Sequence, residues 1–218
     1  MSIRKQYDSD LEALKTALVE MGQNAAEAVE NALEALCTAD TAAAQKIVQG
    51  DDRINNMERD IEHRCMALLL RQQPVAGDLR HISTAMKVVT DIERMGDHAS
   101  DISEITIALA DQPYIKKLEH IQQMAKETMI MLVGSIEAFV DKDLEKANEV
   151  IKRDDVVDDL FDKVKKELIQ MIHENADKGE QAADLLMVAK YMERIGDHAT
   201  NISEWVIFSI TGEHKSMN

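Results

Sequence analysis

Apolar residues recur every three or four positions along almost the whole chain, which is the spacing of one face of an α-helix. The pattern breaks only at a few short places that carry aspartate, asparagine, proline or glycine, the residues that end helices and form turns. Between these breaks we expect six long helices. Their predicted ranges are about 9–36, 41–71, 75–110, 115–140, 144–174, and from a corner at 175–179 to near 212.

Residues that start and stop helices stand at these predicted ends. Ser9 and Glu12 form a capping box, and Asp40 or Thr41 can cap the second helix. Pro74 marks the next corner and Pro113 closes the first half. Long helices with short connections pack antiparallel. We therefore predict an all-α fold of two tandem antiparallel three-helix bundles, residues 1–112 and 113–218, with a polar tail from 213.

The chain also contains an internal repeat. The segment 93–99 reads Glu-Arg-Met-Gly-Asp-His-Ala, and 193–199 reads Glu-Arg-Ile-Gly-Asp-His-Ala, so that only the Met/Ile position differs. The agreement continues from 101–104 to 201–204. Such identity at a fixed offset indicates a tandem duplication. The two halves are then expected to be built alike, and residues that recur in both belong either to the core or to a site.

Composition and charge narrow the class of protein. Aromatic residues make up 3% and there are two prolines, which is typical of a helical protein. The apolar runs are far shorter than the roughly 20 residues of a membrane span. No basic segment followed by an apolar one opens the chain, so we expect a cytoplasmic protein. The net charge of -16 argues against nucleic-acid or lipid binding. Cys37 and Cys65 are interpreted as buried thiols.

The repeated segment carries pairs of carboxylates at helical spacing. Glu93 and Asp97 are four residues apart, so both project from one face of the third helix. With Ile92 facing the core, the helical rotation places them at about 100° and 140° from it, and Asp101 near 180°. Like charges at this spacing repel each other. A face that needed only to be hydrated would more easily mix charges of both signs.

The second helix of each half carries a matching set. In the first half it consists of Asp51 and Asn55, with Glu58 and Glu62 continuing the stripe. At about 1.5 Å per residue, Asp51/Asn55 and Glu93/Asp97 both lie roughly 27–30 Å from the shared corner, so antiparallel neighbours bring them to one level. In the second half the same relation holds to about one turn. The residues there are Asp154, Asp158, Glu193 and Asp197.

Oxygen ligands that converge at one level need a counter-charge, which a metal ion supplies. All-oxygen ligands favour hard cations such as Mg²⁺, Ca²⁺, Mn²⁺ or Fe³⁺. The stripe lies beside the core, so the site is expected to be partly exposed. The alternative is a hydrated acidic face of an acidic protein. Gly96 and Gly196 stand in the middle of helices, which indicates that another part of the protein packs closely against them. His98 and His198 are interpreted as capping residues or as forming surface hydrogen bonds.

These residues resemble a known family. The paired Glu-Arg-x-Gly-Asp-His-Ala segments, Asp-Asp-x-Ile-Asn after Gly50, and the corner Gln-Pro-Val-Ala-Gly-Asp-Leu-Arg at 73–80 are similar to the PhoU family of bacterial phosphate-uptake regulators. The resemblance covers nearly the whole chain. It implies a fold of two three-helix bundles and multinuclear metal clusters, of Mg, Mn, Fe or Zn, on the bundle surface. The predicted ligands are Asp51, Asn55, Glu58, Glu93, Asp97 and Asp101, and Asp154, Asp158, Glu193, Asp197 and Asn201.

The two predicted sites differ in their acidic residues. Glu58 and Glu62 are answered by Phe161 and Lys165, and Asp101 by Asn201. The second site is therefore expected to bind metal more weakly or to hold fewer ions.

The function implied by the resemblance is regulation without catalysis. PhoU proteins act as adaptors between the ATPase subunit of the ABC phosphate importer and the sensor histidine kinase of the phosphate two-component system. They restrain phosphate uptake and the phosphate-starvation genes, and members are commonly homodimers. They work at the inner face of the cytoplasmic membrane through protein contacts, without inserting into it. A metal on the bundle surface would recruit phosphate or organise the face that meets a partner.

Other functions have less support in the sequence. A helical di-metal oxidase needs Glu-x-x-His motifs that point into the bundle core, whereas Glu93 and His98 are five residues apart and the stripe faces outward. No nucleophile with a base, phosphate-cradling loop or strand–turn–helix motif is visible. A structural or metal-storing helical scaffold remains an alternative, which metal content and partner capture would distinguish.

Overall fold

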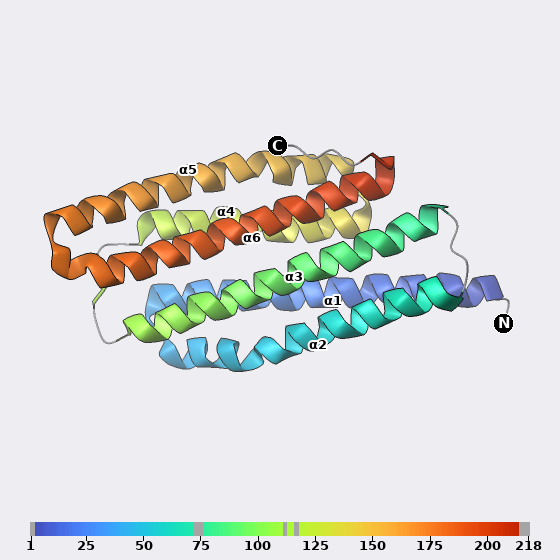
Figure 1. The fold of residues 1–218 in the computed structure, drawn as a ribbon, viewed down its shortest axis with the longest axis horizontal. Coiled ribbons are helices and arrows are strands. Elements are labelled where there is room, and N and C mark those ends of the chain that lie inside the picture. Colours follow the sequence, from blue (N-terminus) through green and yellow to red (C-terminus); the bar gives the residue numbers. More distant parts are fainter. Residues whose placement is uncertain (1–2, 72–75, 111–112, 116–117, 214–218) are drawn as a thin grey trace.

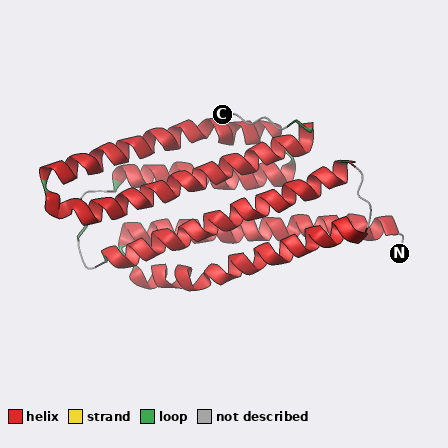
Figure 2. Cartoon of the chain, viewed as in Figure 1, coloured by secondary structure: helices red, strands yellow, loops and turns green. Residues whose placement is uncertain are grey.

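The structure, a computed structural model, describes residues 3–71, 76–110, 113–115 and 118–213. These residues form six α-helices and one short 3₁₀ turn, without any strand (Figure 2). The elements are α1 (Ile3–Thr38), α2 (Thr41–Arg71), α3 (Ala76–Leu109), α4 (Glu119–Asp141), α5 (Leu144–Glu174), η1 (Ala176–Lys178) and α6 (Gly179–Thr211).

The helices follow the predicted plan of two antiparallel three-helix bundles. Successive helices reverse direction, with α1, α2 and α3 in one bundle and α4, α5 and α6 in the other (Figure 1). The bundles also pack on each other, because α3 lies against α6 and α1 against α4. α3 and α6 run antiparallel in Figure 1. The same segment of each half therefore lies at the boundary between the halves.

The duplication is visible in the helix ends. The Asp40 carboxylate accepts hydrogen bonds from the backbone N–H groups of Ala42 and Ala43, both at 3.0 Å, and so caps α2. Asp143, 103 positions later, caps α5 in the same way. The residues before these caps, Ala39 and Lys142, both have a φ of 54°. The predicted cap at Asp40 is confirmed, and the range 144–174 is the observed α5.

Two predicted helix starts differ from the structure. α1 begins at Ile3, before the predicted capping box. Tyr7 in this added stretch is buried in the core, and this packing extends the helix. α4 begins at Glu119 and not at 115. The reason is a tertiary contact, since the Ile115 N–H donates to the Gln181 side chain at 2.5 Å and holds this stretch against α6. The predicted corner at Pro74 and the last five residues of the tail lie outside the described residues, as do 111–112 beside the predicted domain boundary.

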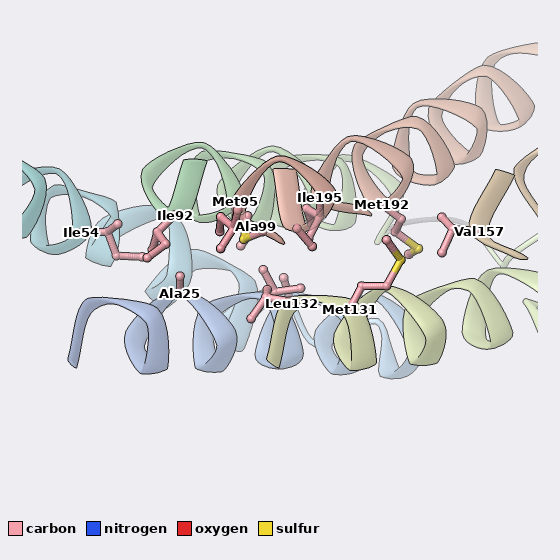
Figure 3. Packing of buried hydrophobic residues seen from close by; sticks show 14 of the residues in the cluster. Ala25, Ile54, Ile92, Met95, Ala99, Met131, Leu132, Val157, Met192 and Ile195 are labelled. Carbon is pink, nitrogen blue, oxygen red and sulfur yellow. The ribbon is translucent and has the colours of Figure 1, made fainter. Parts of the chain in front are cut away.

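One apolar core runs through both halves, and methionines contribute to it. Met95, Met131 and Met192 are fully buried. Figure 3 shows Met131 of α4 and Met192 of α6 pointing toward each other, with Val157 of α5 beside them. Bundles that share a core hold their surface sites in fixed relative positions.

The two cysteines differ. Cys65 is buried, as predicted, and burial raises the pKa of its thiol to about 12. The prediction was wrong for Cys37, which is exposed. It lies in the last turn of α1 on the face away from the core, since the adjacent Leu36 is fully buried.

None of the helices in the described part of the chain combines the length and the apolarity that a membrane span requires.

Candidate functional site

α2 and α3 bring together the carboxylates that the helix register predicted to lie at one level. Burial raises the pKa of Asp51, and the nearby Asp97 carboxylate raises it further. Burial also raises the pKa of Glu58, with smaller contributions from Glu62 and Asp97. Since charges from two helices affect one another, the two stripes form one cluster. We name Asp51, Asn55, Glu58, Glu93 and Asp97 the first carboxylate site.

Glu93 is the most perturbed acid of the first carboxylate site. Burial raises its pKa to about 7, and Asp97, Glu58 and Asp51 add to this effect. Its side chain is only 12% exposed. Glu93 Oε2 is buried and has no hydrogen-bond donor, although Arg94 Nε lies 3.3 Å away. This carboxylate therefore lacks the donors that normally stabilise a buried charge.

The first site contains little internal compensation for its charge. Asn55 Nδ2 donates to Asp51 Oδ2 at 3.0 Å, which leaves Asn55 Oδ1 buried without a partner. Arg94 Nη1 donates to Asp97 Oδ2 at 2.9 Å, but the arginine side chain is 55% exposed. A cation that is mostly in water neutralises a neighbouring carboxylate only weakly.

α5 and α6 form the corresponding cluster in the second half. Burial raises the pKa of Asp154 to about 6, with further contributions from Asp158 and Asp197. The pKa of Asp158 is raised by burial and by Glu193. Asp197 stands at the exposed rim, yet partial desolvation and Glu193 raise its pKa as well. We name Asp154, Asp158, Glu193 and Asp197 the second carboxylate site.

The second site holds a cation of its own. Lys190 Nζ donates to Glu193 Oε1 at 2.6 Å and lies 2.5 Å from Oε2. The same ammonium group lies 5.4 Å from the ring centre of Phe161, the residue that replaces Glu58. Lys165, which replaces Glu62, also lies over this ring. The second half thus replaces two carboxylates by an aromatic ring and one lysine, and it adds a second lysine, Lys190, where the first half has Thr90.

Asp101 and Asn201, which were predicted as ligands, lie toward the boundary between the two halves. Asp101 Oδ2 is 3.1 Å from His98 Nδ1, and Asn201 Nδ2 donates to Asp91 Oδ1 at 3.3 Å. The structure does not join either residue to the carboxylate sites. His98 is an i,i+3 neighbour of Asp101 on α3, whereas the antiparallel packing of α3 on α6 supplies Asp91 to Asn201, which a helical wheel of one helix does not contain.

The two repeated histidines also lie at this boundary. They were predicted to cap or to form surface hydrogen bonds; His98 does contact the Asp101 carboxylate, but it is buried and not at the surface. Its ring is 8% exposed and stacks on Tyr191 with ring centres 5.2 Å apart. His198 Nδ1 lies 2.8 Å from Asp91 Oδ1. Asp91 and Tyr191 are equivalent positions of the repeat. Each histidine therefore contacts the other half, and together they link α3 to α6.

The repeated glycines differ in how closely they are packed. A Cβ at Gly96 would lie 2.8 Å from Ile54 Cδ1 and 3.2 Å from its Cγ2, which confirms the predicted close approach. A Cβ at Gly196 would meet ordinary contact distances, the shortest being 3.5 Å to Asp154 Oδ1. The predicted close packing therefore holds for Gly96, against the side chain of Ile54, and not for Gly196.

The donor atoms of the first site suit a hard metal ion. It offers carboxylate oxygens from two helices and two buried oxygens without donors, Glu93 Oε2 and Asn55 Oδ1. Such oxygens are the ligands that Mg²⁺, Ca²⁺ and Mn²⁺ prefer. Among the described residues, no three histidine, cysteine, aspartate or glutamate side chains are arranged as a finished metal centre. Metal binding would require these side chains to change rotamer, and it remains a prediction.

Two residues that matter at these sites were not singled out from the sequence. Lys190 lies three residues before Glu193, a spacing that places both side chains on one helical face and so could have revealed the pair. Asp91, the partner of His198, carries no such signal, because it is 107 residues away along the chain. Only the packing of the halves reveals it.

Comparison with known proteins identifies relatives along the full chain. The family model of the PhoU domain matches residues 18–106 and again residues 121–206. The phosphate-specific transport system accessory protein PhoU homolog of Clostridium acetobutylicum is 40% identical over 216 residues, covering 99% of both chains. The corresponding Aquifex aeolicus homolog is 38% identical over 185 residues, covering 85% of this chain and 84% of its own. These relatives are accessory proteins of transport and not enzymes, which agrees with the predicted absence of catalysis.

Solved structures have the same fold. The crystal structure of PhoU from Pseudomonas aeruginosa superimposes with a TM-score of 0.93 at 32% identity, covering 95% of this chain and 100% of that one. The phosphate transport system regulatory protein PhoU from Streptococcus pneumoniae gives a TM-score of 0.91 at 28% identity, covering 97% and 100%. With two matching domains and a relative that is 40% identical end to end, the chain belongs to the PhoU family.

Proposed function

We propose that this protein regulates phosphate uptake as an accessory protein of a phosphate-specific transport system. The observation that carries the proposal is the match of both halves to the PhoU domain, together with relatives of that description along the whole chain. As an adaptor it contacts the ATPase subunit of the ABC phosphate importer and the sensor histidine kinase of the phosphate two-component system. It restrains both uptake and the phosphate-starvation genes when phosphate is plentiful.

The surface supports a role through protein contacts. The formal net charge of -16 opposes binding to nucleic acid or to anionic lipid headgroups. In this proposal the protein works in the cytoplasm as a homodimer. Its partners hold it at the inner face of the membrane.

The test is capture of partners from cells grown in high and in low phosphate, with this protein as bait. The expected result is recovery of the importer's ATPase subunit and of the sensor kinase, in amounts that change with phosphate. Recovery of neither protein under either condition would contradict the adaptor role. A bait that carries only residues 113–218 is not a suitable control, because the halves share one core. A mock bait of similar charge serves instead.

Metal binding at the first carboxylate site is the second part of the proposal. Its support is the set of oxygens from Asp51, Asn55, Glu58, Glu93 and Asp97, two of which are buried without donors. Mg, Mn or Fe ions suit these ligands better than Zn. When bound, the ion supplies positive charge that attracts phosphate or orders the face that meets a partner. The chain's own contribution is to hold the carboxylates of α2 and α3 at one level.

The variant Glu93→Ala/Asp97→Ala tests this part. If it folds, has lost its metal and no longer restrains the phosphate-starvation genes, the metal is needed for regulation. Normal regulation by the folded, metal-free variant would contradict the role of the metal while leaving the adaptor role intact. Metal bound equally by this variant and by the unchanged protein would contradict the site itself.

A further inference from the structure

A cavity lies next to the first carboxylate site. It has a volume of about 180 Å³, is lined by residues of α1, α2 and α3, and opens to solvent. Asp51 and Ser100 stand on one side of it, Ile54 and Gly96 form its floor, and Glu27 lies at its exposed edge. An engineered cavity of about 150 Å³ is large enough to bind benzene. This cavity therefore has room for a group slightly larger than a planar six-membered ring.

The second half has larger side chains at the equivalent positions. Between α1/α2 and α4/α5 the repeat has an offset of 103, so Arg153 stands at the position of Gly50 and Glu127 at that of Asn24. An Arg153 N–H group donates to the Glu127 carboxylate, and Arg153 is half-buried. The second half thus carries at this position a guanidinium group paired with a carboxylate.

A second substitution also introduces a larger side chain. Ala28 of the cavity wall is replaced by Met131, which is fully buried and whose Cε approaches the Cβ position of Gly196 to 3.6 Å. Figure 3 shows this methionine beside Val157 and pointing toward Met192. In the first half the small residues Ala28 and Gly50 leave the corresponding volume open.

The charges around the open cavity suit a cation. Glu27 and Asp51 contribute two carboxylates, and Asn24 and Asn31 contribute amide oxygens. Arg53 also lines the cavity, so the cavity's two carboxylates exceed its cations by one charge; the same arginine borders a second hollow that contains Glu20, Asp60 and Arg64. Ile130 stands at the position of Glu27 in the second half, so that half lacks this carboxylate.

We propose that this cavity binds the guanidinium group of an arginine side chain that is presented by a partner protein. The first half accepts from outside the group that the second half supplies as Arg153. A planar guanidinium donates to several oxygens at once, which matches a wall of carboxylate and amide oxygens. The inference stands apart from the proposed function, because it needs neither a particular partner nor a bound metal.

The test uses the small number of glycines in the chain. With selective ¹⁵N-glycine labelling, eight glycines give the backbone signals, and Gly50 and Gly96 line the cavity while Gly134 and Gly196 report on the second half. The protein is treated with a chelator and titrated with N-acetyl-arginine-amide, which mimics an arginine within a peptide. The matched probe is N-acetyl-citrulline-amide, which has nearly the same shape without the charge.

We expect the signals of Gly50 and Gly96 to shift saturably with the arginine probe, and those of Gly134 and Gly196 to stay in place. The citrulline probe should bind at least tenfold more weakly. Equal shifts with both probes, or shifts spread over both halves, would overturn the proposal. If free arginine bound more tightly than the blocked probe, the ligand would be an amino acid and the assignment to a partner protein would be wrong.

Variants that exchange the two halves' residues give the control. The change Asn24→Glu/Ala28→Met/Gly50→Arg copies three residues that already coexist in the second half, and it should abolish the Gly96 shift by filling the cavity. The reverse change, Glu127→Asn/Met131→Ala/Arg153→Gly, should create a shift at Gly196. Retained binding in the filled variant would overturn the proposal. The opened variant decides independently, because its gain of binding does not depend on the filled variant's folding.

Discussion

The two carboxylate sites descend from one duplicated segment, yet they balance their charges differently. In the second site Lys190 pairs with Glu193. Phe161 and Lys165 stand there in place of two acids of the first site, and both lysines lie over the phenylalanine ring. Glu193 Oε2, like Glu93 Oε2, is buried without a hydrogen bond of its own, but Lys190 lies beside it, whereas the Arg94 near Glu93 is mostly exposed. The second half supplies its own cations, whereas the first half retains acids that an external cation can neutralise.

The same contrast holds at the neighbouring cavity. Arg153 and Met131 stand at the equivalent positions in the second half, whereas the small residues Gly50 and Ala28 line an open cavity in the first. Both differences leave the first half with charge and space that its own side chains do not use. An identical motif, Glu-Arg-x-Gly-Asp-His-Ala, therefore has different surroundings in the two halves. We infer that ligand binding is concentrated in the first half.

The largest expected difference comes from one substitution made at equivalent positions. The pKa of Glu93 is raised from 4.5 to about 7, so the folded state loses stability as the pH rises from 4.5 to 7. In chelator at pH 8, Glu93→Gln should raise the free energy of unfolding by roughly 2–3 kcal/mol. Below pH 4 this gain should vanish.

The control is Glu193→Gln, which removes the partner of Lys190 and should lower the free energy of unfolding by about 0.5–1 kcal/mol. Urea unfolding at both pH values measures the two effects. A change of the same sign at both positions would contradict the difference in charge balance between the sites.

The two helical glycines provide the next comparison. Gly96→Ala places a methyl group against Ile54 and should destabilise the protein by about 1 kcal/mol, because overpacking outweighs the gain in helix propensity. Gly196→Ala meets no such contact and should stabilise it by about 0.5–1 kcal/mol. Shifts of the urea midpoint in opposite directions are expected, and stabilisation by both substitutions would show that Ile54 yields freely.

The next comparison exchanges Lys190 and Thr90 between the two sites and measures the metal affinity of each site. Lys190→Thr gives the second site the residue that stands at Thr90 in the first, and Thr90→Lys makes the reverse change. We expect the former to strengthen Mn²⁺ binding at the second site about fivefold and the latter to weaken it at the first site by a similar factor, or about 1 kcal/mol. Calorimetric titration checks both. Unchanged affinities would show that Lys190 does not compete with a metal.

The smallest expected effect concerns the boundary between the halves. His98 stacks on Tyr191 and is buried, whereas His198 contacts Asp91 and is half-buried. Because His98→Ala removes more buried surface, it should cost about 1 kcal/mol, and His198→Ala about half as much. Thermal unfolding measures the difference, and equal losses would show that the two contacts are energetically alike.

The sequence predicted most of the fold because the helices carry local signals. The apolar spacing and the aspartate caps gave α5 its observed ends, and helix arithmetic placed Asp51 beside Glu93 and Asp97. Both depend on distances along one helix or on one short connection. The start of α4 was misjudged because Ile115 is held by Gln181, 66 residues away.

Most limits of prediction at the site have the same cause. Asp101 lies one turn from Asp97, but it contacts His98, which is three residues earlier on the same helix, and the prediction did not include this competing i,i+3 pair. Asn201 contacts Asp91, which only the packing of the bundles brings close. The open cavity also escaped prediction, because it depends on the sizes of Ala28 and Gly50 on two different helices. A helical wheel describes neighbours within a helix and not those between bundles.

The central claim is that the first site, and not the second, binds metal with the higher affinity. Its most direct test is a Mn²⁺ titration of chelator-treated protein, followed by electron paramagnetic resonance, with Glu93→Gln/Asp97→Asn and Glu193→Gln/Asp197→Asn as matched variants. We predict that the tightest binding is lost in the first variant and kept in the second. Loss of the tightest binding in the second variant, or equal losses in both, would contradict the claim.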